Sequence, residues 1–468
     1  MTRQATDRGV HVLCALVTCA LGPACKPADR GPDLQIAGET LHLRPADPVP
    51  RTSPWFDGQR ISLVAAQGET LGMQVLHRGG GPITLTLPGA TGFEVRRVHV
   101  VRPSTSMYGG SHGAGDYPDE LVPAAAPETD PAYFTVRADA DATGELVVGA
   151  WHIPVTLHVV PVKLPQLPLD VWGYYDAREL HGTVDAVNDA ERACIAMFAD
   201  HGVLLSPDMP PSAWRARKDL VPTKYVPAVI GGADDVRAWL AEAPDRDVFA
   251  IPIDEPHTSE QRAKVVALAK TVREAGGGKF LYAVTDTPHP EYGDLIDLYI
   301  SPKAAHLEGD QHRRWTYNGT PPEAGSMVVD AESPGTRTWG WIAYRYRIPV
   351  WYVWDALYWH DRHNKKIGLD AGRDAVSFDD GDDHGNLDGV LALPGCHPTL
   401  RLEALRRGYE DRALLELAAK CHPAETAALA AKMIPRALGD AKGAPAWPED
   451  EAVWEAARRQ LLELAACH

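Results

Sequence analysis

Short alternating runs of apolar and polar residues, interrupted at close intervals by Gly and Pro, fill residues 35–162. Ile61–Ala66, Val95–Val101 and Val155–Val160 are examples. Alternation with a period of two is typical of strands that bury one face, and the turn residues mark where each strand ends. The pattern predicts an antiparallel β-sandwich over residues 35–162.

The pattern changes after Pro161, Pro165 and Pro168, which stiffen a linker and stop strands from continuing through it. Apolar runs then alternate with helical patterns. The expected strands are Leu169–Tyr174, Val203–Ser206, Tyr225–Ile230, Val248–Ile253, Phe280–Thr285, Leu298–Ile300, Met327–Asp330 and Val350–Trp354. The expected helices are Asp189–His201, Asp234–Glu242, Ser259–Ala275, Arg337–Tyr346 and Thr399–Lys420. This alternation predicts a (β/α)8 TIM-like barrel over residues 168–420.

The C-terminal residues 421–468 are rich in Ala and follow a helical pattern, apart from an interruption at Gly443–Pro448. They predict a C-terminal helical extension. The expected fold class is therefore multidomain, with an N-terminal antiparallel β-sandwich, a (β/α)8 barrel and this extension in chain order.

The N-terminal segment has the order of an export signal. Arg3 and Arg8 precede an apolar stretch, Val10–Leu21, which is too short to span a membrane as a helix, and Cys25 follows. We expect a signal peptide of the lipoprotein type over residues 1–25 with the lipid on Cys25, followed by a linker over residues 26–34. Cys19 is the weaker alternative for lipid attachment. The mature protein would then be periplasmic, anchored to the outer membrane or at the cell surface.

Four further cysteines follow the signal: Cys194, Cys396, Cys421 and Cys467. An oxidising compartment would allow Cys421 to pair with Cys467 and link the C-terminal helices. The alternative is that all four are buried thiols, which is common for this residue. None of them has the spacing of a zinc site or a Cys-x-x-Cys motif.

Composition narrows the classes of function. The formal net charge is −17, and an acidic surface repels phosphate backbones, so general nucleic-acid binding is excluded. Trp is plentiful, with 13 residues against 7 Phe, which is more than packing alone requires.

Two adjacent acids are the sharpest candidates for chemistry. Asp254 and Glu255 directly follow the apolar run Val248–Ile253, so they are expected at the C-terminal rim of the barrel, where barrel enzymes keep their active sites. Adjacent carboxyls suit substrate-assisted sugar hydrolysis, an exception to the usual pair on separate elements. The alternative is that both acids favour the N-terminus of the helix that begins near Ser259.

Aromatic residues are dense between Trp315 and Trp359, and flat rings with polar edges suit sugar binding. Tyr317 and Trp359, on expected loops, and Trp354, at the end of an expected strand, are the best candidates. Those on a helical pattern are expected to pack in the core, namely Trp339, Trp341 and Tyr344.

Two stretches of the sequence superficially resemble metal-binding motifs, but neither has a complete set of ligands. Residues 379–389 superficially resemble a calcium loop, but His384 occupies a ligand position and the closing Glu is missing, so we interpret them as a solvated loop. His360 and His363 have no third ligand for zinc. The prediction is that there is no metal and no cofactor. A hydrolase with a metal in the acidic loop remains a minor alternative.

Several short sequence motifs, spread over most of the chain, together resemble those of a known protein family. They are Ile61–Ala66 with Glu69 and Gln74, Tyr117–Asp119, Trp315–Tyr317, Arg337–Tyr346, Val350–Trp359, Asn386–Val390, Leu393–Gly395 and Arg401–Asp411. In combination they resemble glycoside hydrolase family 123 and its relatives, the DUF4091 group. The resemblance implies a β-N-acetylgalactosaminidase-like enzyme that acts on glycans such as glycosphingolipid sugars.

The resemblance also implies roles for particular residues. Asp254 would orient the acetamido group and stabilise an oxazolinium ion, and Glu255 would act as general acid and then as base. The residues Tyr317, Trp354 and Trp359 would shape the sugar subsite. The charged residues of the last stretch also match the family and are interpreted as a helix-capping ion network: Arg401, Glu403, Arg406 and Asp411.

We therefore expect an exported, retaining glycoside hydrolase that releases β-linked N-acetylgalactosamine or a related 2-acetamido sugar. Its partner would be a glycan that carries such a sugar, and it would touch a membrane only through the lipid anchor. The alternative is a non-catalytic, glycan-binding surface lipoprotein with a glycosidase-like barrel. The chain is shorter than characterised family members, which favours this alternative, whereas the intact acid pair argues against it.

Overall fold

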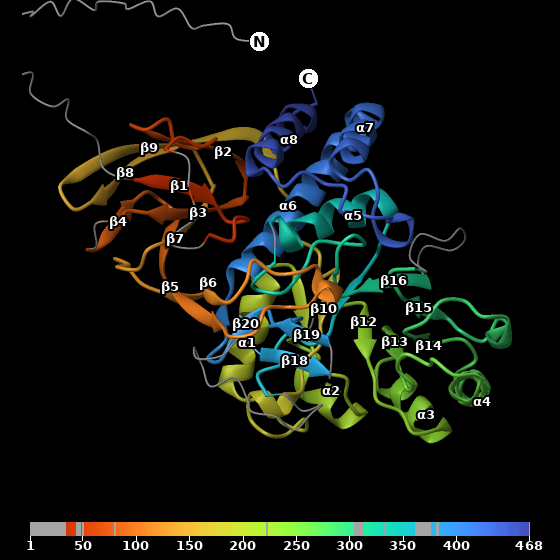
Figure 1. Cartoon of the computed structure of the whole chain (residues 1–468). Helices are drawn as coiled ribbons and strands as arrows, with labels where there is room; N and C mark the ends of the chain where they lie inside the picture. The colour runs from red at the N-terminus through yellow and green to blue at the C-terminus, as the bar shows by residue number, and fades with distance from the viewer. Residues whose placement is uncertain are drawn as a thin grey trace, which may run out of the picture.

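A computed structural model describes residues 34–467, apart from residues 44–47, 49–50, 79–80, 221–222, 304–312, 332, 361–375 and 381–382. The expected signal peptide with Cys25 lies outside the described residues. Two N-terminal sheets lie on one side of the molecule, an eight-stranded parallel sheet lies on the other, and C-terminal helices run along the top (Figure 1). None of the helices in the described ranges is long and apolar enough to cross a membrane.

The two N-terminal sheets share one hydrophobic core, into which residues such as Met73 and Leu146 point. In spatial order, the first sheet consists of β1 (Gln35–Gly38), β3 (Thr70–Leu76), β7 (Ala132–Arg137), β5 (Ala90–Val100) and β6 (Gly115–Pro123). The second consists of β2 (Ile61–Gln67), β9 (Trp151–Lys163), β8 (Ala142–Val148) and β4 (Ile83–Thr86). Neighbouring strands are antiparallel, as predicted, except that β2 and β9 run parallel.

The second large unit is a parallel sheet of eight strands. Their spatial order is β11 (Val203–Leu205), β10 (Val171–Gly173), β17 (Trp351–Val353), β16 (Arg314–Tyr317), β15 (Leu298–Ile300), β14 (Phe280–Val284), β13 (Asp247–Ala250) and β12 (Tyr225–Pro227). This is the neighbour order of a barrel that is opened between β11 and β12, where the described residues form an isolated bridge from Met209 to Ala228. A parallel, barrel-like sheet is therefore confirmed.

One predicted strand is wrong. Residues 327–330 are irregular, and the strand between β15 and β17 is instead β16, in a stretch expected to be a loop. Val328 and Val329 are buried, which explains their apolar pattern, but the N–H of Val329 bonds to the carbonyl of Asn386 instead of joining the sheet. This correction moves Tyr317 from a loop to the C-terminal end of a barrel strand.

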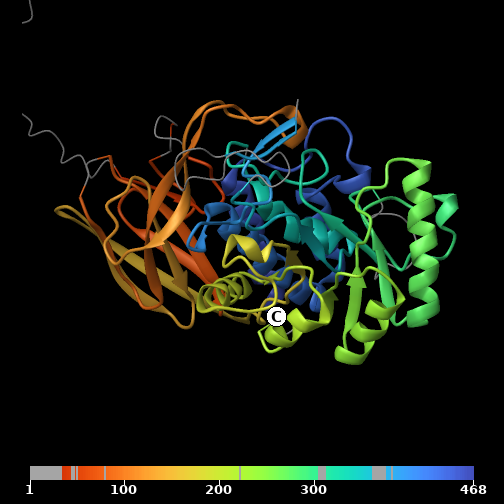
Figure 2. The same ribbon diagram turned by 90° about the horizontal axis from the view of Figure 1, so that it is seen from below.

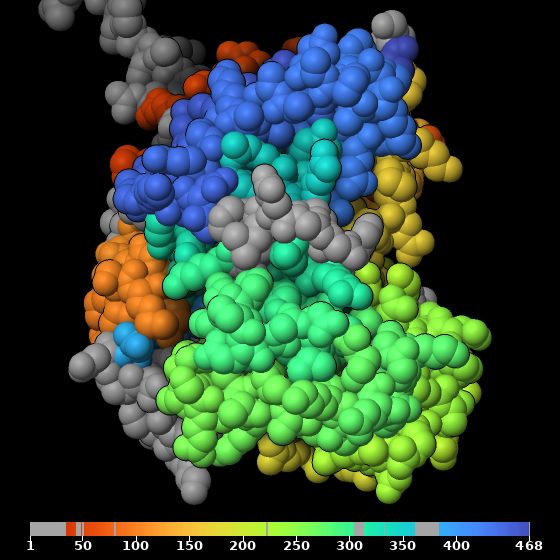
Figure 3. All heavy atoms as spheres, turned by 90° about the vertical axis from the view of Figure 1, so that its right-hand side faces the viewer, coloured from red at the N-terminus to blue at the C-terminus, as the bar shows by residue number. Residues whose placement is uncertain are grey.

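The helices surround the parallel sheet and form the C-terminal region. They are α1 (Asp189–Asp200), α2 (Pro211–Arg217), α3 (Ala233–Glu242), α4 (Ser259–Gly276), α5 (Thr338–Tyr346), α6 (Leu400–Cys421), α7 (Pro423–Met433) and α8 (Glu451–Ala465). The sequence patterns predicted all of them except α2, which has only seven residues. Helix α4 lies at the outer edge, far from the N-terminal sheets (Figure 2). Figure 3 views the molecule from that edge. Residues from about 230 to 300 form its lower part, and the C-terminal helices lie above them.

Buried ion pairs join α6 and α8 to the N-terminal sheets. The guanidinium of Arg407 contacts the carboxylates of Glu39, Glu69 and Glu410, the last two at 2.6 and 3.1 Å. Arg458 of α8 contacts the same Glu69 at 2.9 Å. Because these side chains are almost fully buried, the charges depend on one another for compensation.

The predicted helix-capping network on α6 has a different role. Arg401 pairs with Asp119 of β6 at 2.8 Å, and Asp411 pairs with Arg337 at 2.9 Å, immediately before α5. The helix itself is capped by Thr399, whose hydroxyl accepts from the N–H of Leu402. The charged residues therefore hold α6 against its neighbours instead of capping it.

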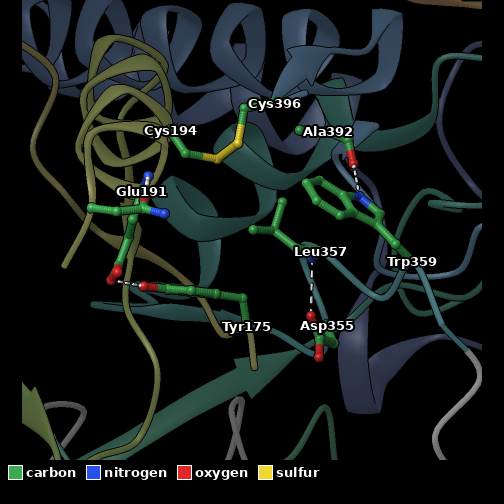
Figure 4. The surroundings of a disulfide bond; sticks show 9 residues. Tyr175, Glu191, Cys194, Asp355, Leu357, Trp359, Ala392 and Cys396 are labelled. Carbon is green, nitrogen blue, oxygen red and sulfur yellow. Dashed lines mark hydrogen bonds between the residues drawn. A yellow bond between two sulfur atoms is a disulfide. The ribbon is translucent and has the colours of Figure 1, made fainter. Parts of the chain in front are cut away.

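Two disulfides cross-link the described part of the chain after the N-terminal sheets. Cys421 pairs with Cys467, so α6 is linked to the chain after α8, as the sequence allowed. Cys194 of α1 pairs with Cys396 in the turn between β20 (Ala392–Leu393) and β21 (His397–Pro398), a pairing that was not predicted (Figure 4).

Candidate active site

The two adjacent acids lie just beyond the C-terminal end of β13. The strand ends at Ala250, earlier than predicted, and an irregular segment leads to Asp254 and Glu255. Glu255 has a φ of +40°, a left-handed backbone that is uncommon for a residue with a side chain. Because the chain bends there, both side chains reach the wall of one cavity instead of opposite faces of a strand.

Thr285, the residue after β14, holds both acids. Its hydroxyl donates to Oδ1 of Asp254 at 2.5 Å and accepts from the backbone N–H of Glu255 at 2.7 Å. The sequence pattern does not mark Thr285 as a candidate site residue. Its position could have indicated it. A polar residue at the end of a strand next to β13 lies at the same edge of the sheet as the two acids.

Tyr317, the last residue of β16, donates its hydroxyl to Oε1 of Glu255 at 2.6 Å. Burial and the negative charge of Glu255 raise the pKa of Tyr317, so it remains a neutral donor. On the open side, Nε2 of the exposed His257 lies 3.6 Å from the other oxygen of Glu255. The sequence-predicted Tyr317 is thus in direct contact with the acid pair.

The acids open into a hollow of about 310 Å³, which we call the main cavity. A volume near 300 Å³ is at the small end of the range for ligand pockets. Its walls are formed by Met107, Tyr108, Asp254, Glu255, Thr285, Pro302, Thr316, Tyr317, Asn318, Gly319, Thr320, Glu323, Ala324, Tyr352, Trp354, Asp388 and Leu438.

A second hollow of about 180 Å³, the side hollow, is also bordered by Asp254. It is lined by Trp172, Tyr174, Asp208, Pro227, Ala228, Phe249, Ala250, Ile251, Asp254, Tyr352 and Trp354. Trp172 stacks on Tyr352 with ring centres 4.3 Å apart, which gives the hollow an aromatic wall. Asp254, Tyr352 and Trp354 border both hollows, whereas Glu255 borders the main cavity alone.

Trp354, predicted as a sugar-binding residue, is fixed from behind by Asn318. The side-chain amide of Asn318 donates to the Trp354 carbonyl, and its oxygen accepts from the Trp354 N–H, both at 2.9 Å. Such paired bonds hold the backbone of Trp354 in place, so its ring is positioned between the two hollows.

Trp359, the third aromatic candidate, does not line the site, so its prediction as a sugar-binding residue is wrong. Its ring is 5% exposed, packs in the core near the Cys194–Cys396 disulfide, and donates its indole N–H to the carbonyl of Ala392 at 2.8 Å (Figure 4). It borders neither hollow. Knowing which residues form strands and which form loops does not tell that Trp354 lines the cavity while Trp359 is buried. Between these two residues the chain turns back into the core.

Several carboxyls of the two hollows have raised pKa values. Asp254 remains accessible through the cavity, yet the surrounding protein desolvates it enough to raise its pKa; the charge of Glu255 adds to this and the Thr285 hydroxyl opposes it. Burial raises the pKa of Asp388 to about 7 and also raises the pKa values of Glu323 and Asp208. Raised values that cluster in one cavity are typical of functional sites.

The prediction that the acidic stretch 379–389, which contains Asp388, is a solvated loop is wrong. Asp383–Asn386 forms strand β19, which pairs with β18 (Val376–Asp380), and His384 and Asn386 are buried. Asn386 donates to Ser104 and Asp330, which fastens the hairpin to the protein. Asp388 thereby reaches the main cavity.

The histidines give no metal centre in the described part of the chain. His360 contacts Glu179 at 2.6 Å, and His363 lies outside the described residues. Among the residues that the structure describes, no group of three or more His, Cys, Asp or Glu is arranged to hold a metal ion.

The fold is similar to that of a solved glycoside hydrolase. A family 123 glycoside hydrolase from Clostridium perfringens, studied for its hydrolysis of glycolipid glycans, superposes with a TM-score of 0.56 at 9% identity over 93% of this chain and 98% of its own. The resemblance noted from the sequence is thus confirmed at the level of the fold, with family 123 as its structural counterpart. No protein-family profile and no curated protein matches the sequence.

Two weaker likenesses are to other sugar hydrolases. A β-glucuronidase from Parabacteroides merdae aligns at 10% identity and a TM-score of 0.30 over 73% of this chain and 49% of its own. A β-galacturonidase from Eisenbergiella tayi aligns at 8% identity and a TM-score of 0.26 over 73% and 69%. Such scores are too low to carry weight.

Proposed function

We propose that this protein is a retaining glycoside hydrolase that releases β-linked N-acetylgalactosamine, or a related 2-acetamido sugar, by substrate-assisted catalysis. The observation that carries the proposal is the position of Asp254 and Glu255 side by side on one cavity wall, held by Thr285 and Tyr317. The fold likeness to a family 123 glycoside hydrolase supports it.

The two hollows support different tasks for the two acids. Asp254 borders both, so it can accept the amide N–H of an acetamido group that enters the side hollow, while aromatic rings such as Tyr352 and Trp354 contact the methyl group. Glu255 borders only the main cavity and can reach the leaving oxygen there.

The proposed reaction has two steps. The acetamido carbonyl oxygen attacks the anomeric carbon while the bond to the leaving oxygen breaks, and Glu255 gives that oxygen its proton. Asp254, as a carboxylate, offsets the positive charge of the oxazolinium ion. Water then attacks the anomeric carbon, loses a proton to Glu255 and opens the ring, which restores both acids and retains the configuration.

Hydrolysis of matched aryl glycosides tests the proposal. The protein should hydrolyse aryl 2-acetamido-2-deoxy-β-galactoside or β-glucoside and leave aryl β-galactoside intact, because a plain 2-hydroxyl cannot form the oxazolinium ion. Equal hydrolysis of the β-galactoside would contradict the mechanism. Binding of these glycans without any turnover would instead favour a non-catalytic glycan-binding protein.

Substitution of Thr285 by Val tests the ionised state of Asp254. The Thr285 hydroxyl favours the carboxylate, so its loss should raise the pKa of Asp254 further, and Asp254 would then ionise only at higher pH. The acidic limb of kcat/KM should move upward by roughly 1 pH unit. Thr271→Val, on the outer face of α4, is the matched control and should leave the limb in place. An unmoved limb in Thr285→Val would contradict the role of Asp254.

We further propose that the protein is exported and carries a lipid on Cys25. The two disulfides support an oxidising compartment, since structural disulfides are rare in the cytosol. Labelling with a fatty-acid analogue in wild-type and Cys25→Ser cells tests this, and label that persists in the variant would contradict it.

A further inference from the structure

The two hollows contain more carboxyls than the proposed reaction uses. Besides the catalytic pair, Glu323 and Asp388 border the main cavity and Asp208 borders the side hollow. Among the described residues, neither lining contains Lys, Arg or His. From the described residues of these linings, a ligand therefore meets hydrogen-bond acceptors with negative charge and no cation.

The positive charges among the described residues that act on these carboxyls lie outside the two linings. Arg401 lies behind Asp388, but its guanidinium is bound by Asp119 at 2.8 and 3.1 Å and by the carbonyls of Met327 and Leu387. Lys303 acts on Glu323 from outside the lining, and Asp208 feels the like charge of Asp176. His257, beside Glu255, is 77% exposed and therefore screened by water.

Asp388 is held rigidly in this environment. The next residue, Gly389, has a φ of +79°, and a Cβ on it would lie 2.4 Å from the backbone nitrogen of Asp355. The segment is thus pressed against the chain that follows β17, which fixes where Asp388 meets the cavity.

An independent observation points to a polar ligand in the main cavity. Thr316 on β16 lines the cavity, and its hydroxyl is fully buried and has no hydrogen-bond partner among the described residues. Buried hydroxyls are normally paired, so a partner supplied by the ligand would satisfy it. Sugar hydroxyls both donate and accept, which suits Thr316 as well as the carboxyls.

We infer that the two hollows select uncharged glycans, with Asp208, Glu323 and Asp388 accepting hydrogen bonds from sugar hydroxyls and repelling sulfate or carboxylate groups. The inference rests on the proposed function only in taking a glycan as the ligand. Like charges a few ångströms apart in a partly desolvated cavity repel strongly, so each ionised carboxyl should weaken binding of a singly charged glycan by about tenfold or more. Hydroxyl donors carry no such penalty.

An array of glycan pairs that differ only by one sulfate, or by a hexose in place of its uronic acid, tests the inference. The full chain with Glu255→Gln is used, so that bound glycans are not hydrolysed. The neutral member of each bound pair should bind at least about tenfold more tightly at pH 7.5. Equal or tighter binding of acidic members, or no binding of any neutral glycan, would overturn the inference.

Two further substitutions in this background locate the effect. Asp388→Asn and Glu323→Gln should each reduce the preference for the neutral member about tenfold. Glu274→Gln, which removes the same charge from the exposed face of α4, should leave it unchanged. If all three variants change the preference equally, the overall protein charge is responsible and the inference fails; thermal unfolding confirms that each variant is folded.

The result also separates this inference from the proposed function. Preference for neutral glycans that lack a 2-acetamido group would support charge selection and contradict the proposed substrate. Equal binding of a 2-acetamido sugar and its sulfate would contradict charge selection and leave the proposed substrate in place.

Discussion

Replacing Glu255 by Gln should abolish most hydrolysis of 2-acetamido glycosides whose leaving group is a sugar or an alkyl alcohol. An alkoxide leaves slowly without a proton, and in the proposed mechanism Glu255 is its only source. General acid catalysis of this kind contributes about 10²–10⁴ to the rate, so kcat/KM should fall by that factor. The side chain is well placed, since Tyr317 orients one of its oxygens at 2.6 Å.

The leaving group provides the internal control. A nitrophenolate departs without a proton, so Glu255→Gln should lose far less activity on the 4-nitrophenyl glycoside in the first step. Glu274→Gln on the surface of α4 removes the same charge and should keep full activity on both substrates. Wild-type activity of Glu255→Gln on the alkyl glycoside would reject Glu255 as the acid.

Replacing Arg407 by Met should cause the largest loss of stability. Its guanidinium contacts three carboxylates, those of Glu39, Glu69 and Glu410, and also donates to the carbonyl of Thr70 at 2.6 Å. Removing one partner from a buried network leaves uncompensated charge, which costs about 3–5 kcal/mol. The expected result in urea unfolding is a lower free energy of unfolding by that amount.

An exposed arginine serves as the control for this prediction. Arg237 pairs with Asp234 on the surface of α3, and its side chain is 57% exposed. Arg237→Met should change the free energy of unfolding by less than about 1 kcal/mol, because exposed ion pairs contribute little. If Arg407→Met is equally mild, the network between the N-terminal sheets and the C-terminal helices does not stabilise their junction. Neither arginine borders the hollows, so the activity of the folded fraction should persist.

Apolar runs allowed the sequence to predict most barrel strands, since a strand buried on both faces is nearly continuous in hydrophobic residues. The exception is β16, which begins with Arg314 and has only four residues. Val328 and Val329 are as apolar as the residues of the predicted strands, but they are buried without joining the sheet. Apolar character records burial, and it does not by itself specify hydrogen bonding to a neighbouring strand.

The candidate site was predictable where its residues are adjacent in the chain. Asp254 and Glu255 directly follow an apolar run, and both border the main cavity. Asp388 was missed because acidic stretches are usually solvated, and only the packing of β19 against Ser104 and Asp330 carries it inward. Trp359 was misplaced because its partner, the carbonyl of Ala392, is distant in the sequence.

In the proposed mechanism, a neighbouring pair of carboxyls lets the substrate's own amide attack its anomeric carbon. Proton NMR of the products in the first minutes of hydrolysis of an aryl 2-acetamido-2-deoxy-β-galactoside tests this most directly. Two successive inversions at the anomeric carbon predict that the β-anomer of the free sugar forms first and then mutarotates. Initial release of the α-anomer would mean a single inversion by water and would rule out attack by the substrate's amide.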